Sequence, residues 1–376
     1  MVNSLEKVGV LFGGPSPEHD VSVLTGLQAV RALQDSGRYL KVVSIFWSKN
    51  GDFFSIEGPS EAKDYAQGAP NGAEPVSLVL GGEGGFVARR RRVAARFERL
   101  ELDSVAVCTH GGPGEDGSIQ GALDLAGVSF TGPSAASAAL GMDKFAAGEV
   151  ARAAGLRTLP RVVLRSGLTS LPFAGPYIVK PRFGGSSIGI DVVADLATAL
   201  ARLNANVHLR RGAVIEPYRS DLYDLQIALC CFPSLTLSAI ERPLRASASH
   251  EILNYADKYV GGAGMDAAAR ELPAKIPPEL AGSIRQDAIT ASTALGARGV
   301  ARIDFLAGDG QVYFNEINTI PGSLSRHLFV DPPVAFADLL DRLLLESIER
   351  PSAQYSAAGA TGALLLDAKS ISSKLG

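Results

Sequence analysis

The residues of this chain that are best suited to chemistry lie in Arg302–Gly322, which reads RIDFLAGDGQVYFNEINTIPG. Two alternating apolar runs flank a connection that contains two glycines, and this pattern predicts a β-hairpin. Because strand side chains alternate between faces, Arg302 and Asp304 share one face, as do Glu316 and Asn318. Pairing of the strands would bring a guanidinium group together with three hard oxygen donors. This set suits Mg²⁺ and a polyphosphate.

The same pattern has a plainer explanation. Carboxylates mostly stay in solvent, so a hairpin with predicted strands at 302–306 and 312–318 is, taken alone, more typical of an exposed polar sheet face. Motifs elsewhere in the chain have to decide between these two interpretations.

Length and composition indicate a globular protein of two or three domains. The chain has 376 residues and a net charge of −3, which argues against a general affinity for nucleic acid. Cys108, Cys230 and Cys231 have neither the spacing of a disulfide framework nor that of a zinc site, so a reducing compartment is the simplest setting. The N-terminal segment lacks the apolar stretch of a signal peptide, and no later run approaches the length of a membrane span. We therefore expect a cytoplasmic protein that does not bind membranes.

Residues 1–133 are predicted to form an N-terminal α/β domain. A strand at Val8–Phe12 leads through GGPSPEHD into a helix at Val21–Leu33, and Glu18 then lies at the carboxyl end of the strand, where α/β sheets bind ligands. A second buried strand, Ser104–Thr109, delivers HGGPGEDG, whose four glycines allow close approach of the backbone to a ligand. That loop, taken alone, is equally consistent with a structural turn.

The part of this domain between the two strands is less informative. Residues 48–85 are rich in Gly, Pro and charged side chains, and we interpret them as an irregular insertion with room for a hairpin. The arginines of 89–99 are more typical of a solvated helix face than of a polyanion site.

Residues 134–217 are predicted to form a central domain. The Ala-rich segment 134–154 predicts a pair of helices, and a strand at Tyr177–Val179 ends in Lys180. The next residues, RFGGSSIG, offer amides and hydroxyls that can surround phosphate oxygens. The stretch lacks G-x-x-x-x-G-K-[ST], which excludes a P-loop. A plain flexible hairpin is the alternative when the stretch is taken alone.

Residues 218–350 are predicted to form a C-terminal domain that contains the hairpin. A polar loop at 247–264 carries Lys258 and Tyr259, and its glycines suit a lid that closes on ligands. Residues 351–376 form an Ala- and Ser-rich tail that we expect to be poorly ordered.

Six segments in order make a specific combination: LFGGPSPEHDVS, HGGPGEDGSIQG, TGPSAASAALGMDK, VKPRFGGSSIG, DKY and ARIDF…FNEINTIPG. From about Val8 to Leu345 the chain resembles the D-Ala-D-Ala ligase family of the ATP-grasp superfamily. The resemblance implies an α/β fold of three domains, with ATP held between the antiparallel sheets of the central and C-terminal domains. It also implies transfer of the γ-phosphoryl group to a substrate carboxylate, followed by attack of an amine on the acyl phosphate, which requires charge neutralisation more than a nucleophilic side chain.

The resemblance implies roles for the hairpin residues. Asp304, Glu316 and Asn318 correspond to ligands of two Mg²⁺ ions that bridge the phosphates of ATP, with Mn²⁺ as a substitute. Arg302 corresponds to the group that stabilises the transferring phosphoryl group and the tetrahedral oxyanion, and the amide of Gly322 to a substrate or oxyanion contact.

Further residues correspond to nucleotide contacts in the family. By the same resemblance these are Lys144, Lys180, Ser186, Ser187, Glu216, Pro217, Tyr218, Asp224 and Lys258. Two of them depart from the family pattern, because lysine is usual at Pro217, and a glutamate normally meets the ribose where Asp224 stands with one extra residue upstream.

The substrate side shows the larger departures. Glu18, Ser186 and Tyr259 correspond to a hydrogen-bonded set in which the glutamate receives the ammonium group of the first amino acid, and His110 to a residue of that subsite. In the family a serine commonly meets the carboxylate of the second substrate, and here His327, followed by Leu328, stands in its place. A bulkier, titratable ring alters the pocket, and it can bind a carboxylate or act on the attacking amine.

The sequence is compatible with three alternative functions. The first is synthesis of D-Ala-D-Ala for peptidoglycan. The second keeps this chemistry with a different amino acid or amine, in antibiotic biosynthesis or self-resistance. The third is a nucleotide-binding regulatory module without turnover. The substrates are small molecules in the first two cases, and a homodimer is implied by the resemblance alone.

Overall fold

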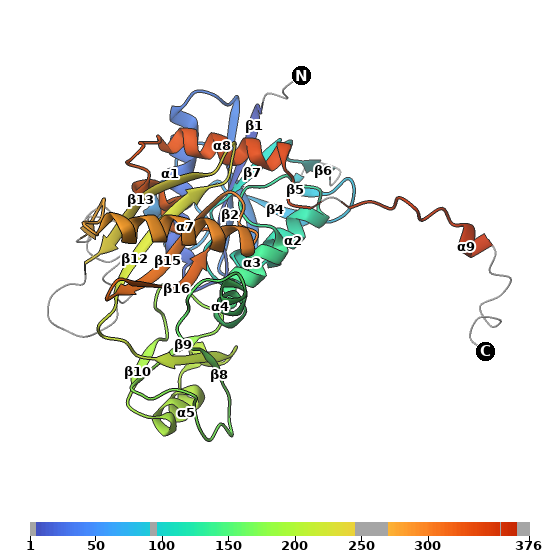
Figure 1. Cartoon of the computed structure of the whole chain (residues 1–376). Helices are drawn as coiled ribbons and strands as arrows, with labels where there is room; N and C mark the ends of the chain where they lie inside the picture. Colours follow the sequence, from blue (N-terminus) through green and yellow to red (C-terminus); the bar gives the residue numbers. More distant parts are fainter. Residues whose placement is uncertain (1–4, 91–95, 245–269, 354, 367–376) are drawn as a thin grey trace.

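Three β-sheets organise the described part of the chain, which is seen here in a computed structural model (Figure 1). The structure describes residues 5–90, 96–244, 270–353 and 355–366. Lys258 and Tyr259 therefore lie outside the described residues.

The first sheet contains the parallel strands that the sequence predicts. β1 (Lys7–Gly13) pairs in parallel with β2 (Lys41–Trp47) on one side and with β7 (Ser104–Val107) on the other. Helix α1 (His19–Asp35) follows β1, and α2 (Ser118–Leu125) follows the short helix η2 (Gly112–Gly114) after β7. Since β1 and β7 run in the same direction, the loops after them emerge at the same edge of the sheet.

The segment from 48 to 99 is more regular than the sequence suggests. It adds four strands in antiparallel succession to the edge of β2, with η1 (Ala62–Tyr65) between them. These strands are β3 (Phe53–Ile56), β4 (Glu74–Val79), β5 (Gly85–Arg90) and β6 (Arg96–Arg99). The predictions of an irregular insertion and of a helix face for the arginines were wrong. The strands are short and glycine-containing segments precede β3, β4 and β5, so only brief alternations, such as buried Phe86 and Ala88 around Val87, mark them.

The second sheet is small and antiparallel, and Figure 1 shows it with α5 (Leu196–Ala205) as a projecting lobe. Its order is β10 (Asp191–Val193), β9 (Tyr177–Pro181), β11 (Ala213–Pro217) and β8 (Val162–Leu164). A small core that includes Val179, Ile215 and Leu209 of η3 (Val207–Leu209) lies between the sheet and α5. The predicted glycine-rich loop joins β9 to β10.

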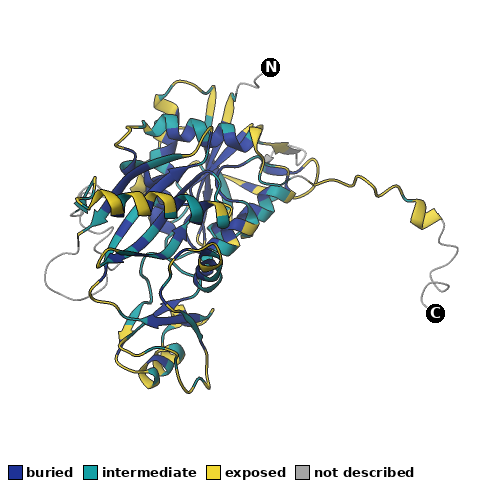
Figure 2. Ribbon diagram, in the orientation of Figure 1, coloured by how far each residue is buried: buried dark blue, intermediate teal, exposed yellow. Residues whose placement is uncertain are grey.

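The third sheet carries the predicted hairpin. Its order is β14 (Arg270–Glu271), β13 (Thr236–Pro243), β12 (Tyr223–Cys230), β15 (Val300–Gly308) and β16 (Gln311–Asn318). Helices α3 (Ala135–Met142), α4 (Lys144–Ala153) and α7 (Pro278–Ala294) pack on one face of the sheet, over side chains such as Ile303 and Ile317. Figure 2 shows these strands largely buried and the outer surface of α7 exposed. The opposite face carries the polar side chains.

The chain then returns to the first sheet. After η5 (Gly322–Leu328), helix α8 (Phe336–Glu349) buries Leu339, Leu340, Leu343 and Leu344 in the same core as β1 and β7. The described tail ends in α9 (Ala363–Leu366), which lies away from the body and is exposed (Figures 1 and 2). None of the helices in the described ranges has the length and apolar character needed to span a bilayer.

Candidate active site

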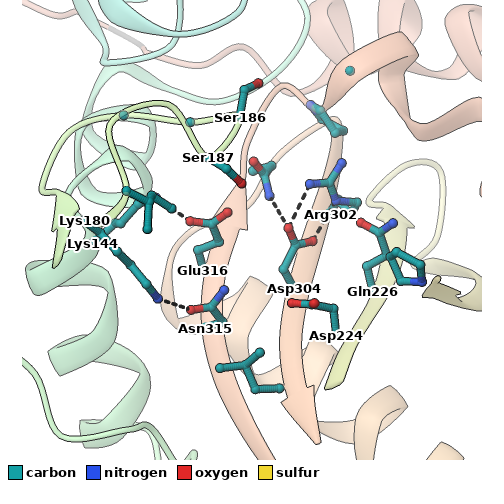
Figure 3. Close-up of a pocket in the computed structure, with 18 of the residues that line it drawn as sticks. Lys144, Lys180, Ser186, Ser187, Asp224, Gln226, Arg302, Asp304, Asn315 and Glu316 are labelled. Carbon is teal, nitrogen blue, oxygen red and sulfur yellow. Dashed lines mark hydrogen bonds and ion pairs between the residues drawn. The ribbon is translucent and has the colours of Figure 1, made fainter. Parts of the chain in front are cut away.

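The hairpin assembles the polar group that strand alternation predicts (Figure 3). In the register of β15 and β16, Arg302 lies opposite Asn318, and Asp304 lies opposite Glu316. Arg302 donates from Nε and Nη2 to the two oxygens of Asp304, at 2.7 and 2.8 Å, and Asn318 Nδ2 donates to Asp304 Oδ2 at 3.1 Å. The predicted grouping of these four side chains is confirmed.

A β-bulge adds a fifth polar side chain that the sequence reasoning missed. The register shifts after Asp304, so that Phe305 pairs with Phe314 and Asn315 has no partner across the ladder. A bulge of this kind places two consecutive residues on one side of a strand. Both Asn315 and Glu316 therefore line the same cavity. The signal in the sequence is two adjacent polar residues that interrupt the alternation of β16.

Two lysines of the central part reach the hairpin. Lys144, the first residue of α4, forms an ion pair with Glu316. Lys180, at the end of β9, donates to Glu216 Oε2 at 2.9 Å and to Asn315 Oδ1 at 3.1 Å. The lysines thus form the wall that faces the carboxylates of the hairpin (Figure 3).

Arg161, which was not predicted as a site residue, holds Glu216 and the backbone at Lys144 and Asn315 in position. Its Nε donates to Glu216 Oε1 at 2.5 Å, and its two Nη atoms donate to the backbone oxygens of Lys144 and Asn315. Burial alone would raise the pKa of Glu216, but Arg161 and then Lys180 hold that pKa below its ordinary value. Glu216 therefore stays ionised in a site that is almost closed to solvent.

Glu18 lies where two glycine-rich loops meet. It is the residue before α1, and Ser186 Oγ from the β9–β10 loop donates to its Oε1. A Cβ atom at Gly185 would lie 2.9 and 3.1 Å from the carboxylate oxygens of Glu18, and one at Gly111 would also collide with them. Only glycines allow both loops to approach this closely.

Two titratable groups of the glycine-rich loop after β7, buried His110 and half-buried Glu115, line the cavity beside Glu18. His110 contacts Ile320 O through Nδ1 at 2.8 Å and Thr25 Oγ1 through Nε2 at 2.9 Å, and burial lowers its pKa to about 4. Glu115 accepts from the amides of Gly111 and Ile320 at 3.1 and 3.2 Å. Burial, and then the charge of Glu18, raise the pKa of Glu115 to about 8. Near neutral pH both side chains are uncharged.

The other end of the cavity is lined by His327 and by residues that the sequence reasoning did not select. His327 Nε2 lies 3.4 Å from Glu241 Oε2. Gln226 Nε2 donates to the same oxygen at 2.5 Å, and Arg270 Nη1 lies 3.3 Å from Glu241 Oε1. This side of the cavity therefore contains a buried, satisfied carboxylate next to an imidazole ring.

A single cavity of about 310 Å³ connects these groups. The predicted residues that line it are Glu18, His110, Lys144, Lys180, Ser186, Ser187, Glu216, Pro217, Tyr218, Asp224, Arg302, Asp304, Glu316, Asn318, Gly322 and His327. Leu328 is fully buried and does not line the cavity.

The donor set fits Mg²⁺ and a nucleotide polyphosphate. In the described part of the chain, no three His, Cys, Asp or Glu side chains form a cluster for a metal ion. Mg²⁺, however, is commonly held by one or two carboxylates together with the phosphates of a substrate. Asp304 and Glu316 supply two facing carboxylates whose side chains are 19% and 24% exposed, and Lys144 and Lys180 supply positive charge beside them. The pairing of Lys144 with Glu316 leaves the lysine within reach of a phosphate bound there.

Fold and site together define a phosphate-binding enzyme with two antiparallel sheets around a polar cavity and a mixed sheet, flanked by helices, beside them. The family described as "D-ala D-ala ligase N-terminus" matches residues 7–133, and that described as "D-ala D-ala ligase C-terminus" matches residues 166–345. The D-alanine–D-alanine ligase of Campylobacter lari is 31% identical over 340 residues, which cover 89% of this chain and 91% of that protein. The chain belongs to the D-alanine–D-alanine ligase family and is an ATP-dependent ligase of the C–N bond-forming type.

Solved structures agree with the fold. The D-alanine–D-alanine ligase of Helicobacter pylori is 25% identical with a TM-score of 0.70, and the match covers 93% of this chain and all of that one. The VanG D-Ala:D-Ser ligase of Enterococcus faecalis is 24% identical with a TM-score of 0.71, over 90% of this chain and 98% of that one. Its likeness supports the ATP-grasp fold alone.

Proposed function

We propose that this chain joins D-alanine to a second amino acid, with D-alanine as the leading candidate for both positions, and that the dipeptide enters peptidoglycan synthesis. The observation that carries the proposal is the arrangement around one cavity. Glu18 and Ser186 form one group of the lining. Lys144 and Lys180, with the facing carboxylates Asp304 and Glu316, form a second. Arg302 lies beside this second group, and His327 completes the lining. These are an ammonium acceptor, a phosphate site and an acceptor subsite in succession.

The donor subsite is formed by the glycine-rich loops. Glu18, held by Ser186, would receive the ammonium group of the first amino acid, with Tyr259 completing the set. His110 and Glu115 are uncharged near neutral pH, so Glu18 is the negative charge that this wall offers. A cationic amine is therefore favoured there over an anionic group.

The phosphate subsite would take ATP with two Mg²⁺ ions or Mn²⁺ in their place. Bound ATP supplies the phosphoryl group that converts the donor carboxylate into an acyl phosphate. Asp304, Glu316 and Asn318 would hold the metal ions, while the lysines Lys144, Lys180 and Lys258 and the loop serines Ser186 and Ser187 would hold the phosphates. Adenine and ribose would lie along Glu216, Pro217, Tyr218 and Asp224.

Arg302 serves the transfer itself. Its guanidinium is held by Asp304 at the centre of the cavity, so it is oriented before substrates bind. A fixed positive charge of this kind stabilises charge that develops on phosphoryl and tetrahedral oxygens, with the amide of Gly322 as a second donor. The acceptor amine would approach from the side of His327, whereas Leu328 is buried behind the cavity lining.

A second candidate keeps the chemistry and changes the acceptor. It is favoured by His327, which puts an imidazole ring next to Glu241 in the acceptor subsite. The chain would then serve antibiotic biosynthesis or self-resistance. His327→Ser should shift acceptor preference toward D-alanine in this case, and an unchanged substrate profile contradicts it.

The experiment that tests both is ADP release over a matrix of D- and L-amino acid pairs, with the product identified by mass. Release with D-alanine alone and a D-Ala-D-Ala product supports the leading proposal. Release that requires another amine supports the second, and a chain that releases ADP with no pair contradicts both.

We also propose a homodimer in the cytoplasm without nucleic-acid or membrane partners. The division into an N-terminal domain at 1–133, a central domain at 134–217, a C-terminal domain at 218–350 and a tail at 351–376 is likewise a proposal. Light scattering coupled to gel filtration tests the first, and limited proteolysis the second.

A further inference from the structure

The acceptor end of the cavity contains a carboxylate that the function proposed above does not use. Glu241, on β13, is 3% exposed. Its Oε2 accepts from Gln226 at 2.5 Å and lies 3.4 Å from His327 Nε2, while its Oε1 lies 3.3 Å from Arg270 Nη1. Both oxygens are thus engaged by groups of the protein.

Glu241 is charged, and its charge is matched within the cluster. Burial alone would raise the pKa of Glu241, but the bond to His327, the charge of His327 and then Arg270 lower it below its ordinary value, so the carboxylate is ionised. Arg270 offsets that single negative charge. A cationic substrate would have to compete with these groups for the carboxylate, whereas the N–H groups of the His327 ring can donate to an anion.

The cluster is aligned with the phosphate site. Glu241 pairs with Gln226 across β13 and β12, Gln226 pairs with Asp304 across β12 and β15, and Asp304 pairs with Glu316. Four polar side chains thus form one row across the sheet. Adjacent strands are about 4.8 Å apart, so Glu241 is roughly 10 Å from Asp304. His327, which contacts Glu241, and Lys144, which pairs with Glu316, therefore lie at opposite ends of this row.

We propose that Glu241 is a positioning residue of the acceptor subsite. It fixes the His327 ring so that this ring contacts the carboxylate of the acceptor. The class of acceptor is then a small α-amino acid with a free carboxylate, and not an amine without a carboxylate or one with a cationic side chain. This inference rests on the proposed ligase function.

A double-mutant cycle tests the role of Glu241. Wild type, Glu241→Gln, His327→Ala and the double variant are compared by ADP release with D-alanine as donor and with D-alanine or D-serine as acceptor. Each single substitution should raise the KM of the acceptor by about 10- to 100-fold, the range for one hydrogen bond to a charged group. The double variant should be no worse than His327→Ala, because Glu241 acts through that ring. The KM for ATP should stay within about twofold.

The control variant is Glu271→Gln on the neighbouring strand β14, where the carboxylate lies 4.0 Å from Arg242 and does not line the cavity. It should leave the KM of the acceptor unchanged. Additive effects in the double variant, or an unchanged KM of the acceptor in Glu241→Gln, overturn the inference while the ligase function stands. A wild-type chain that releases no ADP with any amino acid pair overturns both.

A second measurement does not depend on the Glu241 variants. The ratio of kcat/KM for the acceptor amino acid over its amide, measured with D-alaninamide and D-serinamide, should be large in wild type. It should fall by at least about 10-fold in His327→Ala, since the ring that selects the carboxylate is gone. An unchanged ratio contradicts the contact between His327 and the acceptor carboxylate.

Discussion

At the scale of single residues, Glu316 and Asp304 face each other across β15 and β16, and each is held by a cation. A facing pair of carboxylates suits a metal ion only if both can leave these partners for it. Until the metal ion and nucleotide bind, the ion pairs with Lys144 and Arg302 keep the two carboxylates charged and in position.

Glu316→Gln tests this use of the pair. The amide keeps the size of the side chain but removes one of the two charges available to Mg²⁺, so kcat should fall on the order of 100-fold or more. ADP release over a range of Mg²⁺ concentrations measures it. Glu349→Gln, exposed at the end of α8, is the matched control and should behave as wild type. Near-normal turnover of Glu316→Gln would remove the residue from the metal site.

The pKa of Glu115 predicts a pH-dependent stability. Burial, and then Glu18, raise this pKa from 4.5 to about 8, so the folded state binds the proton more tightly than the unfolded state. The contribution of Glu115 to stability is therefore fully present below about pH 4.5 and is lost as pH rises to about 8. A glutamine in its place cannot ionise and has no such loss.

Urea unfolding of wild type and Glu115→Gln at pH 5 and pH 8.5 checks the sign. The free energy of unfolding of the variant, relative to wild type, should improve by at least about 1.4 kcal/mol between these pH values, which corresponds to one pKa unit. Other titrating groups are common to both proteins and cancel in the comparison. Parallel pH profiles contradict the raised pKa.

At the scale of elements, strand alternation was enough to predict the hairpin but not the details of its surface. The alternation of Arg302 and Asp304 is regular, so their common face was predictable. Asn315 lies on that side because of a bulge, which is set by how β16 fits against its neighbour and not by composition. Glu241 was missed because a lone glutamate near a strand end carries no signal until Gln226 and His327 are next to it.

The short strands of the first sheet were missed for a related reason. β3 to β6 have four to six residues each, and glycine-containing segments precede β3, β4 and β5. Too few residues alternate in each strand for the pattern to exceed the background of charge and glycine. Their stability comes from pairing along the edge of β2, which is a tertiary contact.

Arg161 connects elements that are distant in sequence, and its removal should affect both stability and nucleotide binding. Arg161→Met leaves Glu216, whose side chain is 1% exposed, with Lys180 as its remaining ion-pair partner in the described structure. Because Lys180 still compensates the charge of Glu216, the expected cost is about 1.5–3 kcal/mol, the range for a lost hydrogen bond to a charged group. Denaturant unfolding measures this loss, and the KM for ATP should rise with it, since the positions of Lys144 and Asn315 depend on the same guanidinium.

Two further variants make this prediction specific. Arg161→Lys should restore only part of the stability, because a single ammonium group cannot reproduce a planar fork with three acceptors. Arg31→Met removes an arginine from an ion pair with Glu61 in which both side chains are more than half exposed, and it should cost less than about 1 kcal/mol. Equal behaviour of Arg161→Lys and wild type would show that charge alone is needed.

At the scale of the whole molecule, the cavity exists only where three sheets meet. Glu18 follows β1, Ser186 follows β9 and Arg302 lies on β15, so no single sheet contains a complete site. Helix α8 joins the end of the third part to the core of the first. The glycine-rich loops after β7 and β9 both contact Glu18, so the position of this side chain depends on the first and the second sheet together.

Gly185→Ala tests that dependence without removing any polar group. The backbone at Gly185 does not have a positive φ, so alanine is not strained there, but its Cβ would lie 2.9 and 3.1 Å from the carboxylate oxygens of Glu18. The carboxylate has to move and its bond to Ser186 weakens, so the KM for the first amino acid should rise about 10-fold, as for the loss of one hydrogen bond. The KM for ATP and the free energy of unfolding should change little, since the displaced group is the end of a side chain. Gly282→Ala on α7, where an added Cβ meets nothing within 4 Å, is the control. If both variants share wild-type kinetics, the contact between the glycine-rich loop and Glu18 has no part in substrate binding.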